Sequence, residues 1–194
     1  MKKITRVLAV LAMSFLFLQA NAQKIKTTSG NPDILKAETT INIEFVYDNI
    51  SVGKFKSEQE YIAAKTEEYN KKEAGTGDTW AGKWKSDKAN RYEPKFLELF
   101  SITSGMTTNK NAKYTLIFKT LSIEPGWNIA ISRKPAEIDG EVWIVETENR
   151  DKKICTLSIS NVPGGSAFGA DFDTGLRISE GYANAGKKLA KYLK

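Results

Sequence analysis

The sequence predicts an α+β fold, in which a mixed, mostly antiparallel sheet has helices packed mainly on one face. Residues 40–47, 114–119 and 154–159 alternate with a period of two, which is typical of strands. In residues 141–146, apolar side chains occur at both odd and even positions, which favours a strand covered on both faces. Apolar residues recur every three or four positions over 174–193, which predicts a packed helix. The expected element order is β-α-α-β-(β)-β-β-α.

Residues 1–22 have the features of a secretory signal peptide. A basic stretch ending at Arg6 precedes an apolar run over 7–18, which is too short to be a membrane anchor. Ala20-Asn21-Ala22 matches an A-x-A cleavage site, so the mature chain is expected to begin at Gln23. No cysteine lies near this site, which argues against a lipid-anchored form. For a bacterial source, these features predict a periplasmic or secreted protein without a membrane-spanning segment after cleavage.

Composition limits the partners and the size of the domain. The chain has 29 basic and 23 acidic residues, and three of the basic ones lie in residues 1–22. The remainder therefore has 29 − 3 = 26 basic residues and a net charge of 26 − 23 = +3, a weak argument for nucleic acid, which is not an expected partner. The 172 residues from Gln23 are enough for one domain, expected over 39–194 after a flexible arm at 23–38.

The firmest conclusion about chemistry comes from the absence of histidine. It excludes Ser-His-Asp and Cys-His catalysis, histidine acid–base work and the usual catalytic zinc sites. Cys155 is the only cysteine, so no intrachain disulfide can form, and we expect it to be buried on a strand. We therefore expect no enzyme activity, no cofactor and no metal.

Local signals place the elements of the first half. The polar character of residues 23–38 predicts the flexible N-terminal arm. Ser57 fits the N-cap of a helix over 57–72, and Glu60 completes a capping box. Residues 75–78, with two glycines, are expected to break that helix, and a second helix is expected over 92–104, ended by Gly105.

The second half is predicted to hold the sheet and the last helix. The strand at 114–119 is followed by a possible short strand at 127–131 and by an antiparallel hairpin over 141–160. A glycine-rich loop leads to the helix at 174–193, which Asp173 or Thr174 can cap. The small residues Gly181 and Gly186 would allow this helix to lie close to the sheet.

Residues 79–90 hold the candidate binding residues, which are Trp80, Lys83, Trp84 and Lys85. The functional interpretation is an aromatic and cationic surface for a glycan, a peptide or an acidic partner. The structural alternative is that both tryptophans anchor this segment to the core, with lysine stems lying over them.

Three short motifs near the last helix are better explained by structure than by chemistry. Asp173-Thr174-Gly175 spells the tripeptide of aspartic proteases, but here it opens an amphipathic helix, so capping explains it. Asp171, Asp173 and Glu180 do not match the spacing of a calcium loop. The glycines of the preceding loop do not form a phosphate-binding motif.

The C-terminal block resembles a group of envelope proteins. The features that carry the resemblance are the strand ending in Lys119-Thr120, the hairpin segments 141–145 and 155–159, the glycine-rich loop and the helix from Arg177 to Leu193. This block of about 80 residues resembles uncharacterised secreted Bacteroidetes proteins and, more remotely, the TolB N-terminal domain and the curli-secretion lipoprotein. The resemblance implies a mixed sheet backed by helices and a role in scaffolding or assembly. Many of those relatives are lipoproteins, whereas this chain has no lipidation cysteine.

These observations favour a non-enzymatic cell-envelope protein that binds a protein or a cell-wall component. The alternative is a small-molecule or lipid-binding protein with an apolar pocket between the sheet and the 92–104 helix. A hydrolase that uses Asp171 and Asp173 is a third possibility, and it would need another acid nearby in space.

Overall fold

The structure, a computed structural model, describes residues 23–129, 132–165 and 173–194. The signal peptide predicted over 1–22 lies outside the described residues. The helices and strands follow in this order: β1 Lys24–Gly30, the 3-10 helix η2 Pro32–Leu35, β2 Thr40–Val46, β3 Ser51–Val52, α2 Glu58–Lys72, α3 Thr76–Asp87, the π-helical turn η3 Lys88–Tyr92, α4 Glu93–Ser104, β4 Thr107–Thr108, β5 Tyr114–Glu124, β6 Trp127–Ile129, β7 Ser132–Lys134, β8 Glu137–Glu146, β9 Lys153–Pro163 and α5 Thr174–Leu193.

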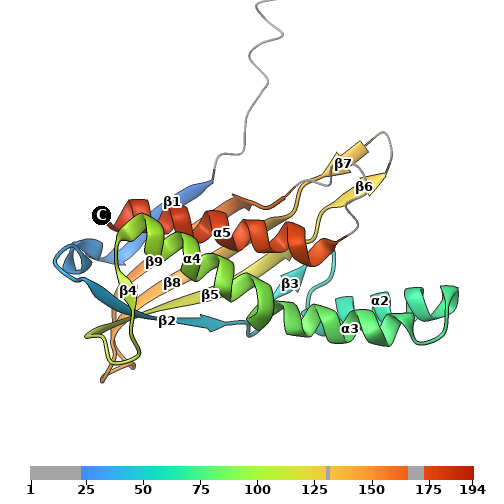
Figure 1. Cartoon of the computed structure of the whole chain (residues 1–194), viewed down its shortest axis with the longest axis horizontal. Helices are drawn as coiled ribbons and strands as arrows, with labels where there is room; N and C mark the ends of the chain where they lie inside the picture. The colour runs from blue at the N-terminus through green and yellow to red at the C-terminus, as the bar shows by residue number, and fades with distance from the viewer. Residues whose placement is uncertain (1–22, 130–131, 166–172) are drawn as a thin grey trace, which may run out of the picture.

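The main sheet has the strand order β1-β9-β8-β5-β2-β4, and β3 also pairs with β5. The pairs β1–β9, β9–β8 and β8–β5 are antiparallel, whereas β2 pairs parallel with both β5 and β4. Helices α4 and α5 lie side by side over one face of this sheet (Figure 1). The predicted α+β class, with a mixed, mostly antiparallel sheet and helices on one face, is confirmed.

Aromatic side chains fill the interface between the sheet and the two helices. The rings of Phe96 on α4 and Phe118 on β5 lie 5.1 Å apart, and Phe45 contacts both of them. Tyr92 and Tyr182 stack with their ring centres 5.0 Å apart. These side chains occupy the space between the sheet and α4 where the alternative function places an apolar pocket.

Helix α5 has the predicted bounds and the predicted cap. The side chain of Asp173 accepts a hydrogen bond of 3.1 Å from the backbone N–H of Leu176. The expectation that both of its small residues approach the sheet is only partly right. Gly181 faces Ile138 of β8 with room for a methyl group, but a methyl group on Gly186 would collide with the backbone carbonyl of Phe96 on α4.

The other two predicted helices are also confirmed. Ser57 caps α2 by accepting a hydrogen bond from the Glu60 N–H, and the Glu60 carboxylate accepts one from the N–H of Lys56 in return. Helix α4 ends at Gly105, which has the left-handed conformation expected of a C-cap.

The prediction of a flexible arm at 23–38 is wrong for most of its length. Residues 24–30 form β1, which pairs with β9 at the edge of the sheet, and Leu35 is fully buried. Ile25 packs against the core, and the Tyr192 hydroxyl on α5 contacts the Thr27 N–H. A strand with one apolar side chain in this polar sequence gave too weak a period-two signal to be recognised.

The expected break at 75–78 is confirmed, because α2 ends at Lys72, but a further helix that was not predicted begins at Thr76. Gly75 has a φ of 84° and forms the turn that leads into α3. A methyl group on Gly77 would collide with the backbone carbonyl of Thr66, so this glycine lets α2 and α3 pack backbone to backbone. The glycines therefore mark a tight helix–helix connection, and the candidate binding residues lie on a helix.

The sheet face opposite the helices carries partly covered side chains. Val142 and Ile144 of β8 are buried beneath the helices, while Trp143 points to the other face. The Nζ of Lys153 lies 3.5 Å from the centre of the Trp143 ring and that of Lys119 lies 5.4 Å from it. The expected covering of both faces is thus provided by helices on one side and by lysine side chains on the other.

The remaining predictions of local structure agree with the described residues. Cys155 lies on β9 and is 1% exposed, and burial raises the pKa of its thiol. Trp127 begins β6, which pairs with β7 in a separate hairpin, although residues 130–131 of the predicted strand lie outside the described residues. Within the described ranges, no helix has the length and apolar character needed to cross a bilayer.

Candidate functional site

The candidate binding residues lie on a helical hairpin formed by α2 and α3, which extends beyond the end of the sheet (Figure 1). Asn70 joins its two helices, because its side chain accepts a hydrogen bond of 2.7 Å from the Gly77 N–H and donates one of 2.9 Å to Asp78. Below, this pair of helices is called the hairpin arm.

An aromatic cluster holds the base of the hairpin arm together. The ring of Tyr61 on α2 lies 4.8 Å from that of Trp84 and 5.6 Å from that of Trp80. Trp80 and Trp84 are themselves 5.7 Å apart, and Tyr69 contacts Trp80 from the other side. Offset and edge-on contacts of this kind stabilise the packing beyond the area that they bury.

Trp84 is a core residue rather than a surface contact. Its side chain is 3% exposed, and its indole N–H donates a hydrogen bond of 2.8 Å to the Glu58 carboxylate. Lys88 completes this unit with an ion pair of 2.7 Å to the same carboxylate. The structural interpretation is therefore correct for Trp84, whereas Trp80 keeps part of its surface exposed.

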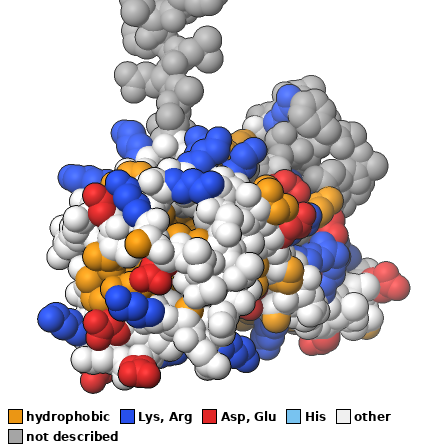
Figure 2. Space-filling view, turned by 60° about the vertical axis from the view of Figure 1, so that its left-hand side comes forward, with side chains coloured by type: hydrophobic (Ala, Val, Ile, Leu, Met, Phe, Trp, Pro, Cys, Tyr) orange, Lys and Arg blue, Asp and Glu red, His pale blue; other side chains and the backbone are white. Residues whose placement is uncertain are grey.

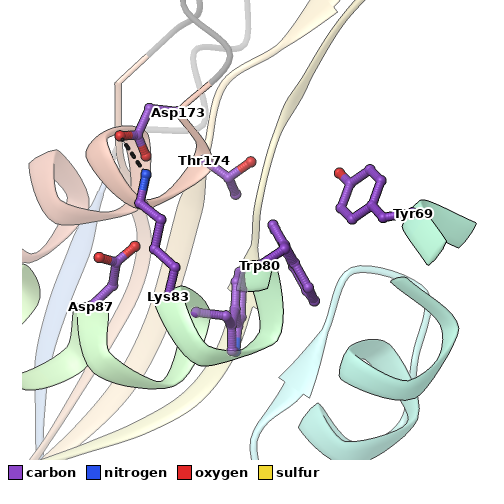
Figure 3. A pocket seen from close by; sticks show the side chains of 8 residues that line it. Tyr69, Trp80, Lys83, Asp87, Asp173 and Thr174 are labelled. Carbon is purple, nitrogen blue, oxygen red and sulfur yellow. Dashed lines mark hydrogen bonds and ion pairs between the residues drawn. The ribbon is translucent and has the colours of Figure 1, made fainter. Parts of the chain in front are cut away.

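A small pocket of about 90 Å³ opens between the hairpin arm and the start of α5 (Figure 3). We call it the arm pocket. Aromatic rings form one wall, and charged and hydroxyl groups form the other; its lining residues are Tyr69, Trp80, Lys83, Trp84, Asp87, Asp173, Thr174 and Gly175. The volume suits a few water molecules or one small group of a larger ligand.

Ion pairs fix the polar wall of the arm pocket. Lys83 extends from α3 to Asp173 at 3.1 Å, and Arg91 reaches the same carboxylate at 2.7 Å (Figure 3 shows the Lys83 contact). Arg91 also pairs with Asp87 at 3.1 Å. The Asp87 carboxylate packs directly against Gly175 in the first turn of α5, where any larger side chain would collide with it. Two carboxylates at this helix N-terminus suit the direction of the helix dipole.

The pKa values of Asp87 and Asp173 are shifted in opposite directions. Desolvation alone would raise the pKa of Asp173, but hydrogen bonds from Arg91, Lys83 and the Leu176 N–H lower it to about 2. Desolvation raises the pKa of Asp87, which is 5% exposed, although Arg91 and Lys83 oppose that shift. Asp173 is thus charged at neutral pH, and the arm pocket offers an anionic and a cationic group beside aromatic rings.

The structure brings only some of the predicted residues together. Trp80 and Lys83 line the arm pocket and Trp84 forms its buried wall, whereas Lys85 is exposed and does not line it. Sequence reasoning missed Tyr69 and the contribution of α5. Asp173 was predicted as a helix cap and, in the hydrolase hypothesis, as an acid beside Asp171, but no sequence signal links it to α3, which lies about 90 residues earlier. Asp171, a residue of the third functional hypothesis, lies outside the described residues.

Comparison with known proteins gives a limited result. No protein-family model matches the chain, and no curated protein matches it. Among solved structures, the PelC dodecamer from Paraburkholderia phytofirmans matches with a TM-score of 0.39 and 9% sequence identity, covering 87% of this chain and 98% of that one. A structure of a PelC variant from the same organism matches with a TM-score of 0.34 and 10% identity, over 86% of this chain and 99% of that one.

Proposed function

We propose that this protein is a non-enzymatic, periplasmic or secreted component of the cell envelope that binds a protein or a cell-wall component. The observation that carries the proposal is the arm pocket, at the base of an extended hairpin arm. Its volume is far below the several hundred cubic ångströms typical of a site that encloses a whole small molecule. A pocket of this size can hold one projecting group of a much larger partner.

The chemistry of the arm pocket fits such a group. The exposed part of Trp80 offers a face for stacking against a sugar ring or an apolar side chain. Lys83 and Asp173 offer a donor and an acceptor beside it. The predicted signal peptide and the resemblance to the TolB and curli-secretion group support an envelope location and a role in assembly. The absence of histidine supports a binding role rather than catalysis.

The alternative of a small-molecule or lipid-binding protein has less support. It requires an apolar cavity between the sheet and α4, where Phe45, Phe96 and Phe118 are in contact.

Photo-crosslinking in cells tests the proposal. A photoreactive residue at Thr79, which is exposed one helical turn before Lys83, is expected to capture one dominant envelope protein or cell-wall fragment. The same residue at Gly82 is the matched control, because this exposed position does not line the arm pocket, lies about 200° around α3 from Trp80 and has space for a side chain. Replacing Trp80 and Lys83 by alanine should remove the Thr79 product. The variant Lys85→Ala separately tests Lys85, the remaining candidate residue that is not buried. A product that is equally strong from Gly82, or that persists without Trp80 and Lys83, would contradict the assignment of the site.

A further inference from the structure

Exposed lysines gather where the first strand meets the last helix. We call this edge of the molecule the lysine edge. Its members are Lys187, Lys188, Lys191 and Lys194 at the end of α5, together with Lys24 and Lys26 on β1, which project from the opposite face of the sheet because Ile25 and Thr27 face the core and α5. The two elements are joined by contacts from Tyr192 to Thr27, including one of 2.9 Å between their side-chain oxygens. Basic side chains are gathered along the top of the described surface in Figure 2.

The lysine edge differs from the rest of the surface in having no acidic counterpart. Residues 23–30 and 181–194 contain no aspartate or glutamate. Across the described ranges, none of the six lysines forms an ion pair, whereas many lysines elsewhere do, among them Lys71, Lys72, Lys95 and Lys134. The edge therefore offers positive charge that the protein itself does not neutralise.

This arrangement makes the charge distribution strongly asymmetric. From Gln23 onward the chain has 26 basic and 23 acidic residues, and six of the basic ones belong to the lysine edge. The rest of the chain then has 26 − 6 = 20 basic and 23 acidic residues, a net charge of 20 − 23 = −3. A molecule with +6 on one edge and −3 elsewhere is oriented by a negatively charged surface, with this edge toward it.

We propose that the lysine edge docks the protein on the anionic lipid headgroups of a membrane. Lysine ammonium groups are point charges on flexible stems, and they suit many scattered phosphates better than one shaped anion. The four lysines of α5 share one exposed surface, and clusters of four to eight basic residues on one surface are a feature of proteins that bind anionic lipid. Tyr192, which is 40% exposed between the two sets of lysines, has the amphipathic character favoured at the headgroup level.

Vesicle sedimentation tests this inference with the protein recovered after export. Binding is expected to vesicles that contain phosphatidylglycerol and phosphatidylcholine, and it should weaken steeply between about 0.05 and 0.5 M salt. Vesicles of phosphatidylcholine alone should not bind. Replacing Lys187, Lys188, Lys191 and Lys194 by glutamine should reduce the partition coefficient at least about tenfold. Each lysine near an anionic surface contributes about fivefold, so four independent contributions would give a reduction of several hundredfold, on the order of 600.

A charge-matched variant separates this surface from net charge alone. Replacing the ion-paired lysines Lys71, Lys72, Lys95 and Lys134 by glutamine removes the same four charges elsewhere and should leave most of the binding. The inference is overturned if the two variants lose binding equally, if neutral vesicles bind as well, or if no vesicles bind. Tighter binding to soluble polyphosphate than to vesicles of equal charge would also overturn it, because it would assign the lysine edge to a polymer.

Discussion

Trp80 and Trp84, four residues apart on α3, have different roles. Trp84 joins the aromatic cluster and donates a hydrogen bond to the Glu58 carboxylate, while part of Trp80 faces the arm pocket. The spacing of four placed both residues on one side of a helix, but burial depends on what α2 brings against that side. The tryptophan that supports the site and the one that can touch a partner are therefore distinguished only by the fold.

Trp84→Ala is expected to lower the free energy of unfolding by about 3–5 kcal/mol, because it leaves a large cavity and removes the hydrogen-bond partner of Glu58. Trp80→Ala should cost at most about half as much, because part of that side chain is exposed in the folded state. Urea unfolding followed by circular dichroism measures both values. Equal losses for the two variants would contradict the distinction between them.

Gly181 and Gly186, two of the three glycines of α5, should respond in opposite directions to the same substitution. Gly186→Ala is expected to destabilise the protein by about 1–3 kcal/mol, since its methyl group meets the Phe96 carbonyl of α4. Gly181→Ala should stabilise it by about 0.5–1 kcal/mol, because alanine is the better helix former and its nearest neighbours would lie 3.6 Å away. Thermal unfolding of the two variants provides the comparison. A gain in stability for Gly186→Ala would mean that α4 and α5 can separate easily.

At the scale of whole elements, sequence patterns predicted the parts that carry their own signal. Helix α5 has a cap and a continuous apolar stripe, and its predicted bounds are those observed. Strand β1 and helix α3 were missed for different reasons. The strand is recognisable only by its pairing with β9, and the helix begins at glycines that usually end one. The arm pocket could not be predicted as a unit, because α5 supplies one wall and α3 the other.

The junction of α3 with α5 should give part of the stability a dependence on pH. The pKa of Asp173 is about 2 in the folded protein, below its ordinary value of 3.8. The stabilisation from its ion pairs is therefore fully present above about pH 4 and is lost as the pH falls through about 2. Asp173→Asn should lower the free energy of unfolding by about 1–2 kcal/mol at pH 7, a range that allows for screening by solvent.

The difference between the native protein and Asp173→Asn should shrink between pH 4 and pH 2, as measured by urea unfolding at each pH. Asp33→Asn is the control, because its ion pair with Lys36 is exposed and should contribute little at any pH. A difference that stays constant down to pH 2 would show that the cap, rather than the charge, accounts for the effect.

On the scale of the whole molecule, the hairpin arm is the part least supported by the core. Helix α2 packs mainly on α3, and its main contact with the sheet is with β3, whereas α4 and α5 lie along the sheet. Backbone amides of α2 are therefore expected to exchange hydrogen faster than those of β5, β8 and α5, through local opening that leaves the sheet intact. Hydrogen exchange followed by mass spectrometry tests this. Equal protection of α2 and β8 would mean that the arm unfolds only with the whole domain.

The pairing of β1 with β9 determines when the fold can be completed. Lys24 pairs with Ser160, so the edge strand joins the sheet across 160 − 24 = 136 residues of chain. Contacts that are so distant in sequence form late, because the entropy of closing the loop must be overcome first. Strand β1, the first among the described residues, therefore waits, unpaired, until β9 has been synthesised. A delay of this kind keeps the chain incompletely folded for longer, which suits the export across a membrane proposed above.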